Sequence, residues 1–167
     1  MNKVLEKISR IARMLSKDNH VILLATIGLH GGPRSRYMGG FQITDTAEFF
    51  LIAPSDTSKM REIQKNSQAQ VIFSSKDHRQ VLTLSGNAAI VKDESVRRAI
   101  YEEKESWSIY PVFNDHFGVI HFVPTQAEYL NLNTSNDTIN IQITITVHTQ
   151  ELGALLRWQS KLPSCHY

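Results

Sequence analysis

The chain has 167 residues, 41% of them hydrophobic, and 18 basic residues against 16 acidic ones give a formal net charge of +2. This size predicts one domain with a real core, and the near-zero charge argues against a nucleic-acid or anionic-membrane partner. Cys165 is the single cysteine, which excludes an intrachain disulfide and a thiolate metal site and fits a reducing compartment such as the cytoplasm. We see no signal peptide and no apolar run long enough to span a membrane.

The N-terminal part predicts a helix followed by a β-hairpin. Apolar residues recur at helical spacing from Val4 to Leu15, which predicts an amphipathic helix over residues 3–16. A β-rich run over 21–27 is closed by a Gly-Gly-Pro turn, and a second strand is expected from Arg34 to Ile43.

The central part predicts a strand, a helix and a second hairpin. Residues 48–53 are typical of a strand buried on both faces, at least in part, and they lead into a helix that begins near Asp56. Two strands follow, over 70–74 and 80–91, joined by a polar turn. Gly86 marks a bulge or a close approach of another backbone.

A third helix, capped by Asp93 and running to about Lys104, precedes an irregular aromatic stretch. Trp107, Tyr110 and Phe113 stand in that stretch. Aromatic residues in a loop pack as a lid on the core or line a ligand pocket, and both alternatives stay open for Trp107 and Tyr110.

The C-terminal part predicts one long strand and an extension. The strand covers 119–130, with Pro124 confined to an edge or a bulge. After a polar linker, Ile and Val alternate with polar residues over 139–147, which predicts a half-buried strand that pairs within the sheet or with another chain. A short helix is expected over 151–159.

Several antiparallel strands connected by short helices favour a mainly β (α+β) fold, a β-barrel with peripheral helices. The strands lack the regular βαβ alternation of a parallel sheet. A doubly wound fold is therefore the less favoured alternative.

Two basic, hydroxyl-rich clusters suggest a phosphate clamp. Residues 33–38 (PRSRYM) lie on an expected strand, and residues 55–59 (SDTSK) lie at an expected helix start. Lys59 would oppose the helix dipole in the first turn, whereas free N–H groups and hydroxyls there favour an anion. The alternative is a solvated lysine on an ordinary capped helix, and Arg36 upstream favours the clamp.

Five segments in order resemble one known family. The N-terminal capped helix is followed by LATIGLHGGPRSRYM, SDTSKMREI, RQVLTLSG and FVPTQAEYL, an arrangement similar to the pyridoxamine phosphate oxidase-like split-barrel flavoproteins, with general stress protein 26 as the nearest branch. The resemblance covers residues 3–131. It implies a six- to seven-stranded antiparallel split β-barrel of Greek-key type, with an FMN-binding domain over 1–131 and an extension over 132–167 packed on it.

The resemblance also implies a homodimer that binds FMN in two clefts between the subunits. Ser58 stands where the family has a basic residue, so Arg34 is expected to compensate, and Gln80 is expected to come from the neighbouring chain. The residues expected at the cofactor are Arg34, Arg36, Tyr37, Met38, Ile52, Ala53, Ser58, Lys59, Gln80 and Trp107.

One departure from the family argues against vitamin B6 oxidation. Leu130 stands where the oxidases have a tryptophan near the flavin, and no arginine follows until Arg157. A substrate phosphate would therefore lack its bidentate partners.

The leading hypothesis is an FMN-dependent oxidoreductase that acts on a small molecule with a nicotinamide donor or oxygen, and whose role is stress-related. The flavin carries the redox chemistry, so no acid–base pair is needed, and we identify no catalytic residue. The seven histidines show no metal-ligand spacing. The alternatives are a flavin-binding module that sequesters or senses FMN without turnover, and a split barrel that uses haem or a deazaflavin.

Overall fold

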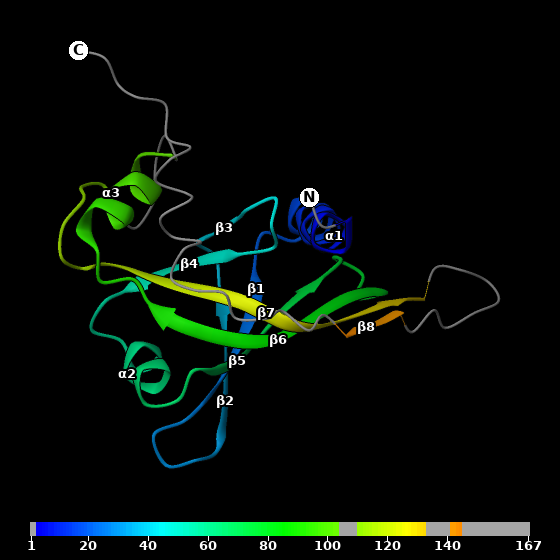
Figure 1. Cartoon of the computed structure of the whole chain (residues 1–167), viewed down its shortest axis with the longest axis horizontal. Helices are drawn as coiled ribbons and strands as arrows, with labels where there is room; N and C mark the ends of the chain where they lie inside the picture. Colours follow the sequence, from blue (N-terminus) through cyan, green and yellow to red (C-terminus); the bar gives the residue numbers. More distant parts are fainter. Residues whose placement is uncertain (1–2, 104–109, 133–140, 145–167) are drawn as a thin grey trace.

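The computed structural model describes residues 3–103, 110–132 and 141–144, which form three helices around a curled sheet (Figure 1). In chain order the elements are α1 (Lys3–Asp18), β1 (Ile22–Ile27), β2 (Pro33–Met38), β3 (Phe41–Ile43), β4 (Phe49–Pro54), α2 (Ser58–Lys65), β5 (Gln68–Ser74), β6 (Gln80–Ile90), α3 (Glu94–Glu102), β7 (Phe117–Asn131) and β8 (Ile141–Thr144). Within this part of the chain no helix has the length and hydropathy needed to cross a bilayer.

All strand pairs of the sheet are antiparallel, in the order β2-β1-β5-β6-β7-β4-β3, and β8 pairs with β7 besides. The sheet curls until β2 contacts β4. The backbone N–H of Ile52 on β4 donates to the carbonyl of Gly40, just after β2, at 2.8 Å. The predicted mainly β split-barrel fold is thereby confirmed.

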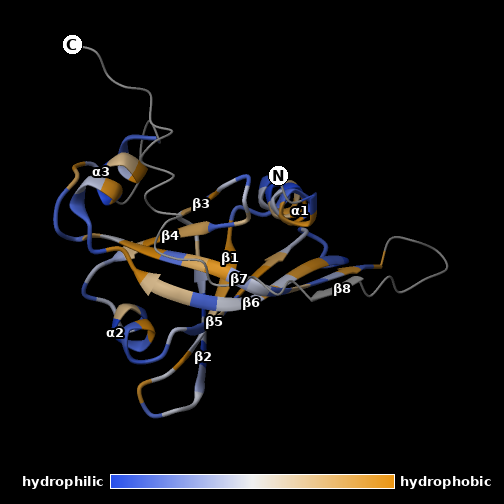
Figure 2. Cartoon of the chain, in the orientation of Figure 1, coloured by the Kyte–Doolittle hydropathy of each residue, from blue (hydrophilic) through white to orange (hydrophobic). Residues whose placement is uncertain are grey.

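The sheet separates two hydrophobic clusters, and β4 contributes to both. Phe49 and Leu51 belong to the main cluster inside the curl, which α1 covers. Phe50 and Ile52 point the other way and pack with residues of α3 in a smaller cluster. This explains why β4 is apolar throughout, as predicted for a strand buried on both faces, and Figure 2 shows the apolar residues concentrated on the strands.

The aromatic stretch after α3 packs into the smaller cluster where it is described. Tyr110 is 6% exposed, and its ring lies 5.1 Å from that of Phe117. Burial, together with the negative charge of Asp56, raises the pKa of the Tyr110 phenol to about 12. Core packing therefore accounts for Tyr110, whereas Trp107 lies outside the described residues.

A bulge in β6 and β7 confirms two predictions. The pairing of the two strands shifts register between Ser85 and Gly86, and Gly86 lies opposite Pro124. A Cβ atom at Gly86 would lie 2.1 Å from the carbonyl oxygen of Val123, so this position requires glycine. On its other side β7 pairs with β4 up to Phe122 and with β8 from Gln126, so Pro124 lies between two partners and breaks neither ladder.

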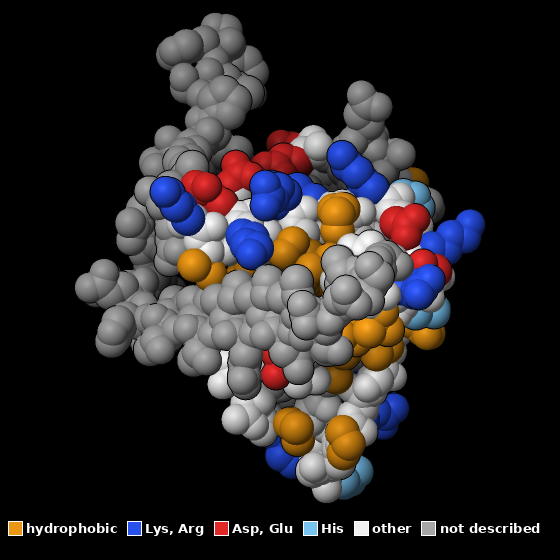
Figure 3. Space-filling model, turned by 90° about the vertical axis from the view of Figure 1, so that its right-hand side faces the viewer, with side chains coloured by type: hydrophobic (Ala, Val, Ile, Leu, Met, Phe, Trp, Pro, Cys, Tyr) orange, Lys and Arg blue, Asp and Glu red, His pale blue; other side chains and the backbone are white. Residues whose placement is uncertain are grey.

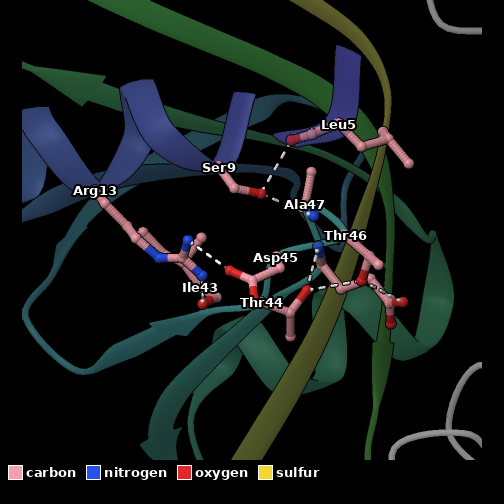
Figure 4. Close-up of polar contacts among 9 residues, drawn as sticks. Leu5, Ser9, Arg13, Ile43, Thr44, Asp45, Thr46 and Ala47 are labelled. Carbon is pink, nitrogen blue, oxygen red and sulfur yellow. Dashed lines mark hydrogen bonds and ion pairs between the residues drawn. The ribbon is translucent and has the colours of Figure 1, made fainter. Parts of the chain in front are cut away.

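Helix α1 is held on the β3–β4 hairpin by polar contacts (Figure 4). Ser9 Oγ, buried in the helix, accepts a hydrogen bond from the backbone N–H of Ala47 at 3.0 Å. Arg13 pairs with Asp45 at 2.8 Å and donates to the carbonyl of Ile43 at 2.8 Å. Ala47 has a positive φ of 57°, which is uncommon for a residue with a Cβ atom, and the hydrogen bond that its N–H donates to Ser9 supports that conformation.

Two boundaries differ from the sequence prediction. The strand expected over Arg34–Ile43 is two strands, because the chain turns at Gly39 and Gly40 from β2 to the opposite edge of the sheet. Helix α2 begins at Ser58 rather than near Asp56. The Asp93 cap of α3 is confirmed, since its carboxylate accepts from two backbone N–H groups.

Of the two elements predicted after residue 132, the structure describes part of the strand and not the helix. The predicted strand over 139–147 is described as β8, which pairs with β7 within the sheet. The helix expected over 151–159 lies outside the described residues.

Candidate functional site

Arg36 lies on the edge strand β2 and points to the inner side of the sheet. Side chains alternate along the strand: Met38 is buried, Tyr37 is 78% exposed, and Arg36 shares the face of Met38 with 18% exposure. The register with β1 places Arg34 opposite Thr26. Both arginines thus lie at the end of β1 that carries Thr26.

Glu62 of α2 joins the two arginines. Its carboxylate, 1% exposed, accepts hydrogen bonds from Arg36 Nη2 at 2.5 Å and from Thr26 Oγ1 at 2.6 Å. Arg36 Nη1 donates to Thr26 Oγ1 at 2.5 Å, and Arg34 Nε lies 3.5 Å from the other carboxylate oxygen. These contacts fix the Arg36 guanidinium between β1 and α2, while Arg34 remains 62% exposed.

The first turn of α2 has no side-chain cap. Thr57 stands at the N-cap, but its hydroxyl donates to the carbonyl of Pro54 at 2.9 Å instead of capping the helix. Ser58 and Lys59 follow, both half-buried. Backbone N–H groups without a capping side chain, beside a hydroxyl and an ammonium group, form a setting that favours an anion.

Lys59 and Glu62 both interact electrostatically with Arg36. Burial and the positive charge of Arg36 lower the pKa of Lys59, against the opposing effect of Glu62. Burial raises the pKa of Glu62, but hydrogen bonds from Thr26 and Arg36 and the arginine charges outweigh it, so the pKa lies below its ordinary value. Glu62 is therefore ionised at neutral pH.

We call Arg34, Arg36, Lys59 and Glu62 the basic cluster. Three cationic side chains and one carboxylate leave a net charge of +2. A phosphate monoester carries about −1.5 to −2 at pH 7. Arg36 uses two of its nitrogens on Glu62 and Thr26 and retains further N–H donors. The donor set thus fits a phosphate group.

The other predicted site residues are placed differently. Tyr37 points outward, Met38, Ile52 and Ala53 are buried in the hydrophobic clusters, and Trp107 lies outside the described residues.

Gln80 lies at the far end of the sheet from the basic cluster. It begins β6 beside the β5–β6 turn, where it accepts a hydrogen bond from the Tyr129 hydroxyl at 2.6 Å. Helix α2 enters β5 at the opposite end of these strands. Gln80 and Arg36 of one chain therefore do not meet.

Sequence reasoning missed Glu62 and Thr26. Glu62 is one helical turn from Lys59, on the same face of α2, next to the apolar positions that face the sheet. A carboxylate at such a position requires a cationic partner, and the arginines of residues 33–38 supply it. Thr26 gave no signal, because threonine is ordinary in a strand.

Away from the basic cluster, charges of both signs are mixed. On the face shown in Figure 3, the described lysine and arginine side chains lie beside aspartate and glutamate side chains. Among the described residues, no group of three or more His, Cys, Asp or Glu side chains is placed to hold a metal ion.

The sequence model of the pyridoxamine 5'-phosphate oxidase like family matches residues 6–152. The chain belongs to this family. Residues 6–152 include both the basic cluster and the whole sheet described above. Among curated proteins no relative matches the sequence.

Solved structures of other proteins show the same fold. The chain is similar to a protein related to general stress protein 26 from Clostridium acetobutylicum (19% identity, TM-score 0.65, 81% of this chain and 96% of that chain). It is similar to a pyridoxamine 5'-phosphate oxidase-related, FMN binding protein from Nostoc punctiforme (17%, 0.61, 80% and 86%). It is also similar to a heme binding protein from Mycobacterium smegmatis (16%, 0.59, 80% and 57%). At these identities the likeness establishes the fold.

Proposed function

We propose that this family member is an FMN-binding flavoprotein and an oxidoreductase that acts on a small molecule. The observation that carries the proposal is the basic cluster, in which two arginines and a lysine converge beside the uncapped start of α2. Its net charge matches a phosphate monoester. Membership of the family and the similarity to the FMN binding protein from Nostoc favour FMN as the phosphate-bearing ligand.

Each residue of the cluster has a defined part in binding. Arg36 and Lys59 would hold the phosphate, Ser58 would add a hydroxyl donor, and the exposed Arg34 would close over it. Glu62 keeps Arg36 in place through their short contact. Bound FMN supplies hydride and electron transfer, so the protein's task is to bind and orient it.

We propose a homodimer with FMN at the subunit interface. Gln80 and Arg36 lie at opposite ends of the sheet within one chain, which supports the proposal that Gln80 contacts this FMN from a second chain. Tyr37, exposed on the edge strand β2, is then available to lie beside the isoalloxazine ring. A stress-related role and a cytoplasmic location belong to the same proposal, in line with the general stress protein 26 relative and the single cysteine.

Vitamin B6 oxidation is not the proposed activity. Leu130 lies on β7 where the oxidases have a tryptophan, and the described residues after it contain no arginine to hold a substrate phosphate. The substrate is therefore another small molecule, reduced or oxidised at the flavin.

Two other candidates share the fold. A non-catalytic FMN-binding protein would use the same basic cluster, and the described residues include no evident acid–base pair. Haem is a candidate because one solved relative is named a heme binding protein.

Absorption spectroscopy separates these candidates. The purified protein is titrated with FMN, riboflavin and haem, and then with NADH or NADPH under anaerobic conditions. Tight FMN binding, weak riboflavin binding and bleaching of the flavin by a nicotinamide support the proposal. FMN binding with no reduction by NADH or NADPH supports the binding module. A haem Soret band that grows on titration, with no FMN uptake, overturns the flavin assignment.

A further inference from the structure

The turn between β1 and β2, residues 28–32, is tied to the helix that carries Glu62. Lys65, in the last turn of α2, donates from its Nζ to the carbonyl of Leu29 at 2.6 Å, and in Figure 1 the turn lies below α2 at the lower end of the molecule. Arg34 follows two residues after the turn, and its Nε lies 3.5 Å from the Glu62 carboxylate. The turn and α2 are therefore held together next to this pair of the basic cluster.

Gly28, the first residue of the turn, leaves room for the Arg34 side chain. A Cβ atom at position 28 would lie 3.0 Å from Arg34 Cδ and 3.1 Å from Arg34 Cγ, whereas packed carbon atoms are about 3.5–4.0 Å apart. Gly28 does not have a positive φ, so its backbone conformation does not by itself require glycine. The aliphatic part of Arg34 lies against the position where a side chain would begin.

The backbone of the turn is held in place by hydrogen bonds. The N–H of Gly28 donates to the carbonyl of Gly32 at 2.7 Å, and the N–H of Gly31 donates to the carbonyl of Gly28 at 2.8 Å. A Cβ atom at position 28 would also lie 3.0 Å from the Gly32 carbonyl oxygen, which cannot move without breaking the first of these bonds. The Arg34 side chain is 62% exposed and free to swing outward. An added methyl group would therefore displace Arg34 rather than the turn.

Such a displacement would matter for a ligand of the basic cluster. The Arg34 side chain is the more exposed of the two arginines, 62% against 18% for Arg36, and its guanidinium has N–H donors besides the Nε beside Glu62. A binding group has to be held within about 0.5 Å of its productive position. Relief of a 3.0 Å contact between carbon atoms requires a movement of about 0.5 Å or more. Position 28 thus decides where the Arg34 guanidinium lies.

We propose that Gly28 is a positioning residue of the phosphate site. Because it has no side chain, Arg34 lies along the turn with its guanidinium beside Glu62, and from there it donates to the phosphate together with Arg36. This inference rests on the proposed function, since it takes the FMN phosphate as the ligand of the basic cluster. It adds a residue that acts on the ligand only through another side chain.

The test compares two alanine variants of the full chain within the same turn. Gly28→Ala is expected to weaken FMN binding about 3- to 10-fold, as for loss of one hydrogen bond, and to leave the binding of riboflavin, which lacks the phosphate, unchanged. Gly32→Ala adds the same methyl group where nothing lies within 4 Å, so it should change the binding of neither ligand. Fluorescence titration measures both affinities.

A double-mutant cycle shows whether Gly28 acts through Arg34. Arg34→Ala alone should weaken FMN binding about 10-fold, and Gly28→Ala should weaken it no further in that background, because the displaced group is absent. Additive losses would overturn the proposal. Equal losses for FMN and riboflavin, a loss in Gly32→Ala as large as in Gly28→Ala, or failure of Gly28→Ala to fold would overturn it as well, since each would show that the turn itself absorbs the added methyl group.

The wild type separates this inference from the proposed function. A wild type that binds FMN no more tightly than riboflavin overturns the proposed function and this inference with it. A wild type that prefers FMN, with the same preference kept in Gly28→Ala, overturns this inference alone.

Discussion

The carboxylate of Glu62 accepts a hydrogen bond from the guanidinium of Arg36 across the contact between α2 and β2, with Nη2 and Oε2 2.5 Å apart. Because Glu62 is 1% exposed and Arg36 18% exposed, water screens this ion pair only weakly. The pair ties an edge strand to a helix. The position of a cation proposed to bind phosphate therefore depends on a residue of the opposite charge.

Replacement of Glu62 by glutamine should destabilise the fold. Glutamine keeps the size of the side chain but loses the charge that compensates Arg36 and Arg34, at a cost of about 1–3 kcal/mol. Urea unfolding at pH 7 measures the loss. Glu94→Gln is the matched control, because that carboxylate is 62% exposed in its pair with Arg98 and should cost only about 0–1 kcal/mol. Equal losses in the two variants would show that the Glu62 pair is not a significant source of stability.

The same carboxylate should make stability sensitive to acid. The pKa of Glu62 is lowered in the folded protein from 4.5, so its contribution is fully present above that pH. The contribution is lost as the pH falls below 4.5 through the lower folded pKa. The difference in unfolding free energy between the wild type and Glu62→Gln should therefore shrink between pH 5 and pH 3. A difference that stays constant over this range would contradict the assignment.

Removal of the Lys59 ammonium should weaken FMN binding selectively. A hydrogen bond to a charged group contributes about 1.5–3 kcal/mol, so Lys59→Ala should lower FMN affinity by about 10- to 100-fold. Riboflavin, which lacks the phosphate, should bind the variant and the wild type alike. Arg61→Ala is the control, since Arg61 lies on the exposed side of α2 and donates to the carbonyl of Asp56. Fluorescence titration of both ligands would contradict the phosphate role if riboflavin lost as much affinity as FMN.

Replacement of Gly86 by alanine should damage the sheet. The added methyl group would lie 2.1 Å from the Val123 carbonyl oxygen and 2.7 Å from Pro124 Cα, both backbone atoms that cannot swing away. We expect a loss of about 1–3 kcal/mol or more, seen as a lower Tm. At Gly32 an added Cβ meets nothing within 4 Å, so Gly32→Ala should leave Tm nearly unchanged. Similar Tm values for the two variants would show that β6 and β7 can separate locally.

The sequence predicted most of the elements because their signals are local. The apolar repeat of α1, the Asp93 cap and the hairpin turns each depend on residues close together in the chain. The break at Gly39 and Gly40 could not be predicted in this way, because it depends on β3 pairing with β4 at the far edge of the sheet. Non-local pairing decides where such a strand ends.

Charge alone pointed to part of the basic cluster, whereas the members that depend on burial were missed. Arg36 and Lys59 stood out because basic residues are unusual on a strand and at a helix start. Glu62 did not, since an acidic residue in a short helix is ordinary until the helix is seen to bury it.

Strand β7, fifteen residues long, lies between β6 and β4 in the sheet and contributes to both hydrophobic clusters. The strand pairs with β6 from Ile120 to Asn131, and its side chains enter both hydrophobic clusters, Phe122 in the main one and Val119 in the smaller. Unfolding of either hydrophobic cluster exposes side chains of this strand, so we expect the two clusters to unfold together as one cooperative unit. In deuterated solvent, the amides of β7 should accordingly be among the last to exchange, at a rate set by global unfolding.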